Sequence, residues 1–319
     1  MSLNSRVFVV VLLTANSLQL TAQALKAYEQ DLPGSSVKFK MIPIPAGTFS
    51  IGSPPTEPAH EEDEGPQKKI SMSAFWMGEH EVSFAEWDAF FKSVDVPQTK
   101  AIALDAVSRP TAQYIDLTWG MGRDGKQPTN SMSQAATIMY CKWLYTKTGI
   151  FYRLPTEAEW EYGCRAGTKT AYSFDNSPER LKEYAYFKDN SGNKFQKVGL
   201  LKPNAWGLYD MLGNLSEWTL DQYDPAAYQK LSDNTKDPLV APATRHPRVV
   251  RGGSYLSDAK ECRCANRIPS LADWNKRDPQ IPKSRWWLTD GMTVGFRLVR
   301  PAQQPPPEEI EKFFAQYLK

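Results

Sequence analysis

Four cysteines, Cys141, Cys164, Cys262 and Cys264, carry the most reactive side chains of this 319-residue sequence. Thiolates bind soft metal ions, whereas an even number of cysteines in an oxidising compartment favours disulfides. The sequence contains no Cys-x-x-Cys pair, so a zinc site is not predicted. Cys262 and Cys264 would face the same side of a strand, because they are two positions apart. Four cysteines allow three pairings, and their spacing does not choose among them.

The N-terminus indicates the compartment. Arg6 precedes an apolar run at 7–13, and a small-x-small cleavage pattern follows at 22–24. The run is shorter than the about 20 apolar residues that span a bilayer, so residues 1–24 are predicted to be a secretory signal peptide. We therefore expect a secreted protein, periplasmic or extracellular, without membrane insertion and with disulfides.

Other patterns that could support catalysis or binding are sparse. His60, His80 and His246 lie in unrelated segments without the convergence that an iron site needs, so iron is not expected. No Gly-rich phosphate loop or nucleophile elbow is present. The 38 basic and 36 acidic residues give a net charge of +2, which argues against a nucleic-acid partner. The acidic run at 61–64 is expected to be a solvated loop rather than a binding site.

Helices and strands that could position these residues are visible in the residue patterns. Capping boxes at Ser83 with Glu86 and at Thr156 with Glu159 predict helices at 82–91 and from Thr156. An apolar stripe predicts a third helix at 133–146. Strands are expected at 41–49, 70–77, 249–250 and 294–299. The 24 prolines, 19 glycines and 10 tryptophans indicate a loop-rich fold that is held by aromatic packing.

The chain is predicted to have one main domain with short flanking segments. Residues 25–37 are expected to connect the signal peptide to a domain at 38–301. Residues 302–319 read as a Pro-rich hinge and a short amphipathic helix at 308–318. That helix is predicted either to pack on the domain or to dock a partner.

Segments spread along the chain resemble, in order, the formylglycine-generating enzyme and sulfatase-modifying factor family. They read IPAGTF at 44–49, FWMGEHEVS at 75–83, YRLPTEAEWEY at 152–162, NAWGLYDMLGNLSEW at 204–218, RVVRGGSY at 248–255 and VGFR at 294–297. The resemblance implies an α+β domain, a C-type-lectin-like variant with little regular secondary structure. Its wider superfamily includes non-haem iron sulfoxide synthases and relatives of the gliding-motility type.

The enzymes of this family oxidise a cysteine of sulfatases to formylglycine, with O₂ and a Cu(I) ion held by two thiolates. The resemblance places the first thiolate position at Ser257 and the second at Cys262, or at Lys260 if two residues are deleted. A serine hydroxyl is a hard, weak ligand that cannot replace a thiolate on Cu(I). We therefore expect neither copper nor formylglycine synthesis, and an exported binding or scaffold module instead. A metal-dependent oxidase with iron or atypical copper, and a divergent sulfatase-maturation enzyme, are the alternatives.

The resemblance also implies a disulfide and a calcium site. Cys164 and Cys264 match a structural disulfide of the family, while Cys141 is either free and buried or paired with Cys262. In a family calcium site, side-chain oxygens of Asn214 and Glu217 and carbonyls of Leu212 and Leu215 would be the ligands, since oxygen donors suit Ca²⁺. The alternative is a metal-free turn that is held by hydrogen bonds of Asn214 and Glu217.

A tryptophan-rich stretch at 269–290 is the candidate recognition surface. Trp274, Arg285, Trp286 and Trp287 could line the cleft where the enzymes of this family bind their peptide. The ligand would then be a protein or peptide segment or a glycan. Alternatively, the tryptophans fill the core under this stretch.

Overall fold

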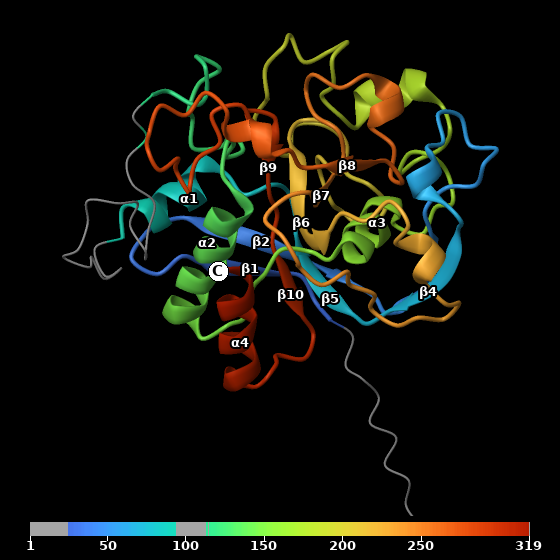
Figure 1. The fold of residues 1–319 in the computed structure, drawn as a ribbon, viewed down its shortest axis with the longest axis horizontal. Helices are drawn as coiled ribbons and strands as arrows, with labels where there is room; N and C mark the ends of the chain where they lie inside the picture. The colour runs from blue at the N-terminus through green and yellow to red at the C-terminus, as the bar shows by residue number, and fades with distance from the viewer. Residues whose placement is uncertain (1–24, 94–112, 114, 319) are drawn as a thin grey trace, which may run out of the picture.

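In the part of the chain that the structure describes, the fold has three small β-sheets and four α-helices, with long irregular loops between them (Figure 1). The computed structural model describes residues 25–93, 113 and 115–318. The predicted signal peptide therefore lies outside the described residues. The combination of separate sheets and helices is the α+β class that the sequence predicts.

The first sheet is antiparallel and has the strand order β1-β2-β5-β10. Its strands are β1 (Tyr28–Asp31), β2 (Lys38–Ile44), β5 (Phe75–Gly78) and β10 (Val299–Pro301). Residues 25–37 are thus more than a connector, because they contain β1, which pairs with β2 in the register Tyr28↔Met41. The sequence hides this edge strand because two of its four side chains, those of Glu29 and Asp31, are exposed and charged.

Two further sheets complete the β structure. One is a hairpin of β3 (Gly47–Ile51) and β4 (Lys68–Met72). The other has the order β8-β7-β6-β9 and consists of β6 (Ser216–Gln222), β7 (Arg248–Arg251), β8 (Arg267–Pro269) and β9 (Val294–Gly295). Its β6–β9 pair is parallel and the other two pairs are antiparallel. Three of the four predicted strands are therefore interrupted: 41–49, 70–77 and 294–299 each contribute to two strands.

The helices begin where the capping residues predict. Helix α1 (Phe84–Phe91) follows Ser83, and α3 (Glu157–Arg165) follows Thr156, each with both hydrogen bonds of a capping box. Helix α2 (Gln134–Thr148) has Ser133 as its N-cap and Gly149 as its C-cap, and it ends two residues later than predicted. Local side-chain to backbone hydrogen bonds determine these starts, so the sequence alone reveals them.

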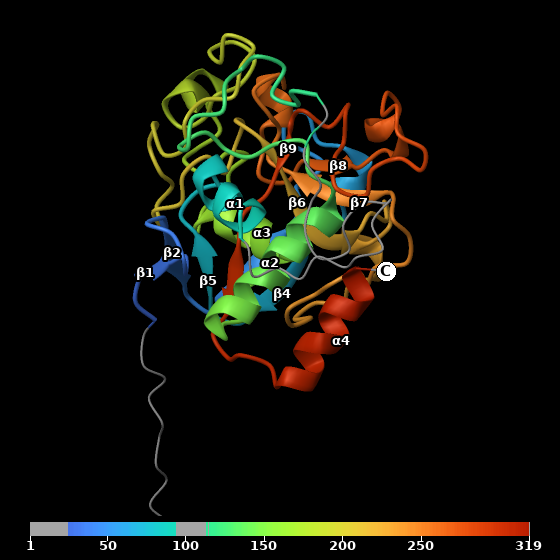
Figure 2. The same cartoon turned by 90° about the vertical axis from the view of Figure 1, so that its left-hand side faces the viewer.

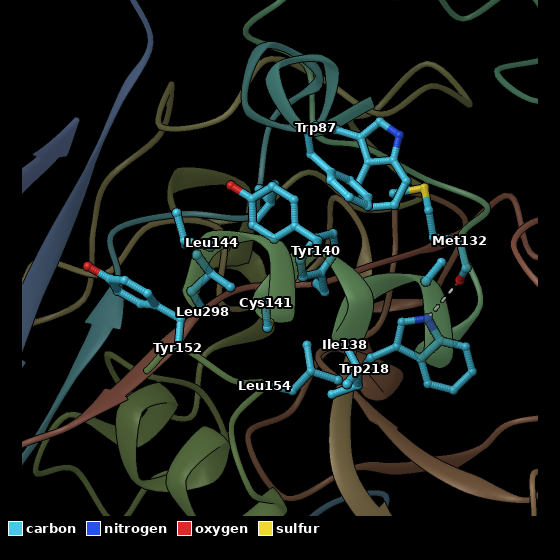
Figure 3. Close-up of a cluster of buried hydrophobic side chains, with 14 of the residues drawn as sticks. Trp87, Met132, Ile138, Tyr140, Cys141, Leu144, Tyr152, Leu154, Trp218 and Leu298 are labelled. Atoms are coloured by element: carbon cyan, nitrogen blue, oxygen red, sulfur yellow. Dashed lines mark hydrogen bonds between the residues drawn. The ribbon is translucent and has the colours of Figure 1, made fainter. Parts of the chain in front are cut away.

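An aromatic core lies between α1, α2 and the sheets (Figure 3). Trp87 stacks on Tyr140 with ring centroids 6.0 Å apart, and Trp218 donates its indole N–H to the Met132 carbonyl at 2.9 Å. Cys141 lies in the same cluster, fully buried. The predicted dependence on aromatic packing is confirmed.

Helix α4 (Pro307–Tyr317) lies beside α2 (Figure 2). Its apolar side chains Ile310, Phe314 and Tyr317 are buried against the domain. The C-terminal helix therefore packs on the body of the protein, which was one of its two predicted roles. Among the residues described, no helix combines the length and apolar character needed to cross a membrane.

Candidate functional site

An open groove of about 710 Å³ lies between the loop at 59–63, the segment at 254–269 and the start of β9. Ser257, Tyr223 and Trp274 are among the residues that line it. The groove therefore contains the position that the resemblance assigns to the first catalytic thiolate. Its volume is in the range of about 300–1,000 Å³ that is common for ligand sites.

Ser257 sits in a tight turn at the edge of this groove. Its amide donates to the Ser254 carbonyl at 2.9 Å, and its hydroxyl accepts from the Ser254 amide at 3.1 Å. These bonds fix the hydroxyl beside the backbone. A neutral hydroxyl in this arrangement has neither the charge nor the softness of a thiolate.

Cys262, the second position in the ungapped reading, points away from solvent. Its side chain is fully buried, and a Cβ on Gly253 would lie 2.7 Å from the Cys262 sulfur, so the thiol is packed against the glycine backbone. Burial in apolar surroundings raises the pKa of this thiol well above its usual range. Ser257 and Cys262 therefore do not provide two thiolates in the groove, and this donor set does not fit Cu(I).

The disulfide predicted from the resemblance is confirmed. Cys164 at the end of α3 is bonded to Cys264, with their Cα atoms 5.8 Å apart. Cys141 and Cys262 are both free and buried, so the alternative pairing between them does not form. The disulfide attaches the 254–269 segment of the groove, which contains Cys264, to the end of α3.

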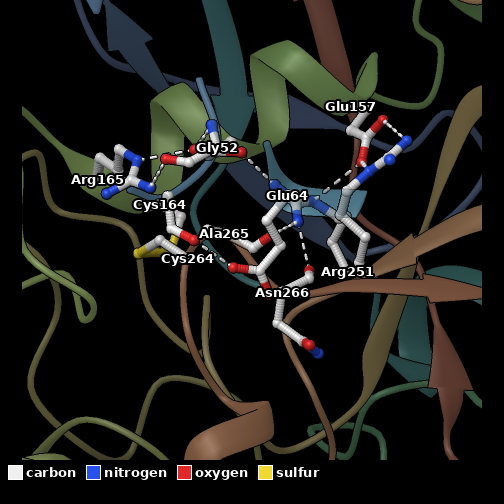
Figure 4. Close-up of polar contacts among 12 residues, drawn as sticks. Gly52, Glu64, Glu157, Cys164, Arg165, Arg251, Cys264, Ala265 and Asn266 are labelled. Atoms are coloured by element: carbon white, nitrogen blue, oxygen red, sulfur yellow. Dashed lines mark hydrogen bonds and ion pairs between the residues drawn. A yellow bond between two sulfur atoms is a disulfide. The ribbon is translucent and has the colours of Figure 1, made fainter. Parts of the chain in front are cut away.

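Two arginines of the groove wall, Arg263 and Arg267, form buried ion pairs with glutamates. Figure 4 shows Arg251, Glu64 and Glu157 among the polar contacts of this region. Arg267 donates to both oxygens of Glu157 at 2.7 and 3.0 Å. Arg263 reaches Glu64 at 2.6 Å, and Arg251 reaches Glu161 at 2.5 Å. Because these guanidinium groups are paired and almost fully buried, their charges are largely neutralised within the protein.

The rim of the groove is acidic. Glu61, Glu62 and Glu261 are exposed, while Lys260 is the exposed cation among the lining residues that the structure describes. Asp63 adds a half-buried carboxylate that accepts the Tyr223 hydroxyl at 2.7 Å. The expected solvated loop at 61–64 describes Glu61 and Glu62, which are exposed, but not Glu64, which is buried. Three of its carboxylates line the groove, and the fourth, Glu64, is buried in an ion pair.

The tryptophan-rich stretch contributes one of its four predicted residues to the groove. Trp274 lines the groove and packs edge-on against Trp218 at 5.6 Å. Trp286 and Trp287 are only 4% and 2% exposed and belong to the aromatic core, as the alternative prediction states. Arg285 is exposed and lines a different pocket, near the end of α4. Arg285 is thus an exposed position between two buried residues, Ser284 and Trp286.

The predicted calcium ligands are engaged elsewhere. Both carboxylate oxygens of Glu217 accept from Arg297, and one of them also accepts the Trp160 indole N–H at 2.7 Å. The Asn214 side-chain oxygen accepts the Gln196 amide at 2.8 Å. Leu212 and Leu215 are buried in the same turn. Since a guanidinium group already neutralises Glu217, these side-chain donors do not fit Ca²⁺ in this arrangement, and a calcium site at this turn stays a prediction.

The three histidines have separate partners. His60 contacts the Ser53 hydroxyl at 2.7 Å, His80 contacts the Glu81 carbonyl at 2.7 Å, and His246 contacts the Ser270 hydroxyl at 2.8 Å. Across residues 25–93, 113 and 115–318, no three His, Cys, Asp or Glu side chains form a group that could hold a metal ion. The donors present do not fit an iron site.

Gly213, in the turn that contains Asn214, gives a direct test of the local backbone geometry. Its φ is +71°, and a Cβ there would lie 2.2 Å from the Tyr186 carbonyl oxygen. Gly149 has a similar φ of +69° with nothing within 4 Å, so it is the matched control. We expect Gly149→Ala to cost about 1–2 kcal/mol of unfolding free energy and Gly213→Ala to cost at least about 2 kcal/mol more. Urea denaturation measures both, and equal losses would contradict the close approach.

Glu81 is predicted to make stability fall as the pH rises. One of its oxygens accepts the Leu215 amide at 3.2 Å, and the other is buried without a partner. Burial, with the nearby charges of Asp210 and Glu217, raises the pKa of Glu81 well above its usual value near 4.5. A raised pKa means that this group's contribution to stability is complete below about pH 4.5 and is lost as the pH rises through the folded-state pKa.

Glu81→Gln removes this titration and keeps the acceptor oxygen. We expect the stability of the variant relative to the unsubstituted protein to improve by about 1–3 kcal/mol between pH 5 and pH 8, because a buried unpaired charge is removed. Denaturant unfolding at the two pH values measures this, with the exposed Glu308→Gln as control. Parallel pH profiles for Glu81→Gln and the unsubstituted protein would show that Glu81 does not titrate as described.

Comparison with known proteins identifies the family of this chain. Residues 30–302 match the family described as the sulfatase-modifying factor enzyme 1-like domain. The chain belongs to this family. The match begins within β1.

Relatives in the sulfatase-modifying factor family include enzymes and other proteins. The formylglycine-generating enzyme of Bos taurus is 28% identical over 296 residues, which cover 77% of this chain and 76% of the enzyme. The solved structure of PvdO from Pseudomonas aeruginosa has a TM-score of 0.63 at 26% identity and covers 82% of this chain and 94% of that one. Treponema denticola variable protein 1 has the same TM-score at 24% identity, covers 86% of this chain and 99% of its own, and shows the shared fold.

Proposed function

We propose that this chain is a binding module of the sulfatase-modifying factor family, which holds a cationic peptide segment in the acidic groove and does not make formylglycine. The observation that carries this proposal is the groove itself. It presents a hydroxyl at the first thiolate position and acidic side chains at its rim.

The charge around the groove supports a cationic ligand. Glu61, Glu62 and Glu261 are exposed to an approaching ligand, and Lys260 offsets one of these charges. The arginines of the wall do not, because each is paired with a buried glutamate. Carboxylates at a groove rim attract and orient Lys or Arg side chains.

The shape and lining of the groove favour a peptide. The groove is open, and its floor offers the half-buried rings of Trp274 and Tyr223 beside backbone and hydroxyl groups. Aromatic rings contact both the apolar stems and the charged ends of Lys and Arg side chains. Export of the protein, which the N-terminal sequence predicts, would place this groove among secreted or periplasmic proteins.

Peptide binding tests this function. A fluorescently labelled Lys/Arg-rich decapeptide should bind saturably in an anisotropy titration, and a Glu-rich decapeptide should not. The double variant Glu61→Gln/Glu62→Gln should weaken binding of the basic peptide about two- to thirtyfold, given about 0.2–1 kcal/mol for each exposed charge.

Glu308→Gln/Glu309→Gln is the matched control, because it removes two exposed carboxylates from the first turn of α4, outside the groove lining. It should leave the affinity unchanged. Equal weakening by the two double variants, or equal binding of both peptides, would overturn the proposal.

A further inference from the structure

A second, basic pocket of about 410 Å³ lies at the other end of β6 and β7, beside α2 and α4. It is lined by the first turn of α2, by the loop at 242–246, by Arg248 and Arg285, and by Tyr317 near the end of α4. Three arginines, Arg245, Arg248 and Arg285, line it, and no carboxylate does within the described part of the chain. The pocket therefore concentrates positive charge.

Arg248 differs from the other buried arginines. It is 7% exposed, donates to the Leu220 carbonyl at 3.3 Å, and leaves its Nε buried without a partner. Arg251, Arg263, Arg267 and Arg297 each lie within 4.0 Å of a glutamate. Arg248 forms no such ion pair with any carboxylate that the structure describes. A buried guanidinium without an anion is costly, so an anionic ligand would stabilise it.

The charge of Asp221 acts on Arg248, but the hydrogen bonds of this carboxylate are directed elsewhere. Its carboxylate accepts the Glu157 amide at 2.7 Å and the Val240 amide at 2.8 Å, and it is not part of the pocket lining. Its hydrogen bonds therefore go to backbone amides rather than to the Arg248 guanidinium.

Two further donors point to an oxyanion. The Tyr317 hydroxyl is buried without a partner, and the Tyr317 ring lies 5.8 Å from the Arg248 guanidinium. Ser133, Gln134 and Ala135 place the N-terminal turn of the 15-residue helix α2 at the pocket. Amide groups at a helix start lack intrahelical acceptors and lie at the positive end of the helix dipole.

The remaining groups at the pocket do not oppose an anion. His246 accepts or donates with the Ser270 hydroxyl, and burial together with the charges of Arg245 and Arg248 lowers its pKa to about 4, so it is neutral at pH 7. The carbonyl of Leu318 beyond the end of α4 is bound by Arg285 at 3.1 Å. That bond covers part of the negative end of α4.

We propose that this basic pocket binds the phosphate or sulfate group of a small organic molecule. Guanidinium groups from separate segments, a hydroxyl and a helix start surround the space, which suits a tetrahedral group with several acceptor oxygens better than a two-oxygen carboxylate. The pocket is larger than such an ion, and Pro242 and Ala243 provide surface for the rest of the ligand. This site is independent of the acidic groove and of the function proposed for it.

Inorganic phosphate and sulfate are the probes, with acetate and chloride as comparisons at constant ionic strength. Calorimetric titration and thermal unfolding should show saturable binding of phosphate, sulfate or both, and no saturable binding of acetate or chloride. The relative affinities of phosphate and sulfate identify which group the pocket takes. Saturation by none of these ions, or the same rise in melting temperature with all four, would overturn the proposal.

Two variants and a control locate the binding. Arg245→Gln, at an exposed position, should weaken binding about tenfold, the usual effect of losing one charged hydrogen bond. Tyr317→Phe should also weaken binding without lowering the stability of the anion-free protein, because the hydroxyl has no partner there. Lys182→Gln removes one exposed charge outside the pocket lining and should leave binding unchanged. Unaltered affinity in both pocket variants would exclude this site.

Discussion

Arg297→Met is expected to lower the free energy of unfolding by about 3–5 kcal/mol, the usual cost of breaking a buried ion pair from one side. The Arg297 guanidinium is fully buried and donates to both oxygens of Glu217 at 2.6–2.8 Å. It also donates to the carbonyls of Gly78 and Tyr209, and so connects β5, β6 and the turn before β6. Methionine fills much of the same volume but leaves the Glu217 charge buried with one neutral donor.

A double-mutant cycle separates this ion pair from packing. Glu217→Gln removes the charge that Arg297→Met would leave unpaired, so the double variant should lose less stability than the sum of the two single variants. Guanidinium chloride unfolding of the four proteins gives the coupling energy. Additive losses would mean that Arg297 stabilises the fold through its carbonyl contacts rather than through Glu217.

Removing the Cys164–Cys264 disulfide should cost about 4–5 kcal/mol, because the bond closes a loop with a sequence separation of 100 residues. Cys164→Ala/Cys264→Ala is the variant to measure in denaturant. A reducing agent should destabilise the unsubstituted protein to a similar extent and leave the double variant unaffected. Equal stability of the oxidised and reduced protein would contradict a structural role for this bond.

Thiol counting checks the redox state of all four cysteines. Cys141 and Cys262 are free, but burial raises the pKa of both thiols. The native protein should therefore react slowly with a thiol reagent. Unfolding without reductant should expose two thiols, and unfolding with reductant should expose four.

The parts of the fold that depend on neighbouring residues could be predicted from the sequence. Each of the side chains of Ser83, Ser133 and Thr156 accepts a hydrogen bond from the backbone amide three positions later in its own helix. The start of each helix therefore depends on residues that are neighbours in the sequence. The disulfide came from the family resemblance, since spacing alone permits three pairings. Strand β1 escaped prediction because it owes its structure to pairing with β2 rather than to an apolar pattern of its own.

The parts that depend on distant contacts could not be predicted in this way. Trp274 and Trp287 are the same residue type in one stretch, yet one lines the groove and the other is in the core. The acidic run at 61–64 was visible, but its place opposite Ser257 depends on chain segments about 200 residues apart. The basic pocket gathers side chains from α2, β7, the 242–246 loop and the C-terminal helix, so no single segment of the sequence reveals it.

The most direct test of the central claim is a single assay for formylglycine. The protein is incubated with Cu(I), O₂ and a sulfatase-type peptide that contains Cys-x-Pro-x-Arg, and the peptide mass is measured, with the bovine enzyme as positive control. Because the groove presents Ser257 while the Cys262 thiol is buried behind Gly253, the peptide should keep its thiol and its mass. Conversion of the thiol to an aldehyde, abolished by Cys262→Ser, would contradict the account and make this chain a divergent sulfatase-maturation enzyme.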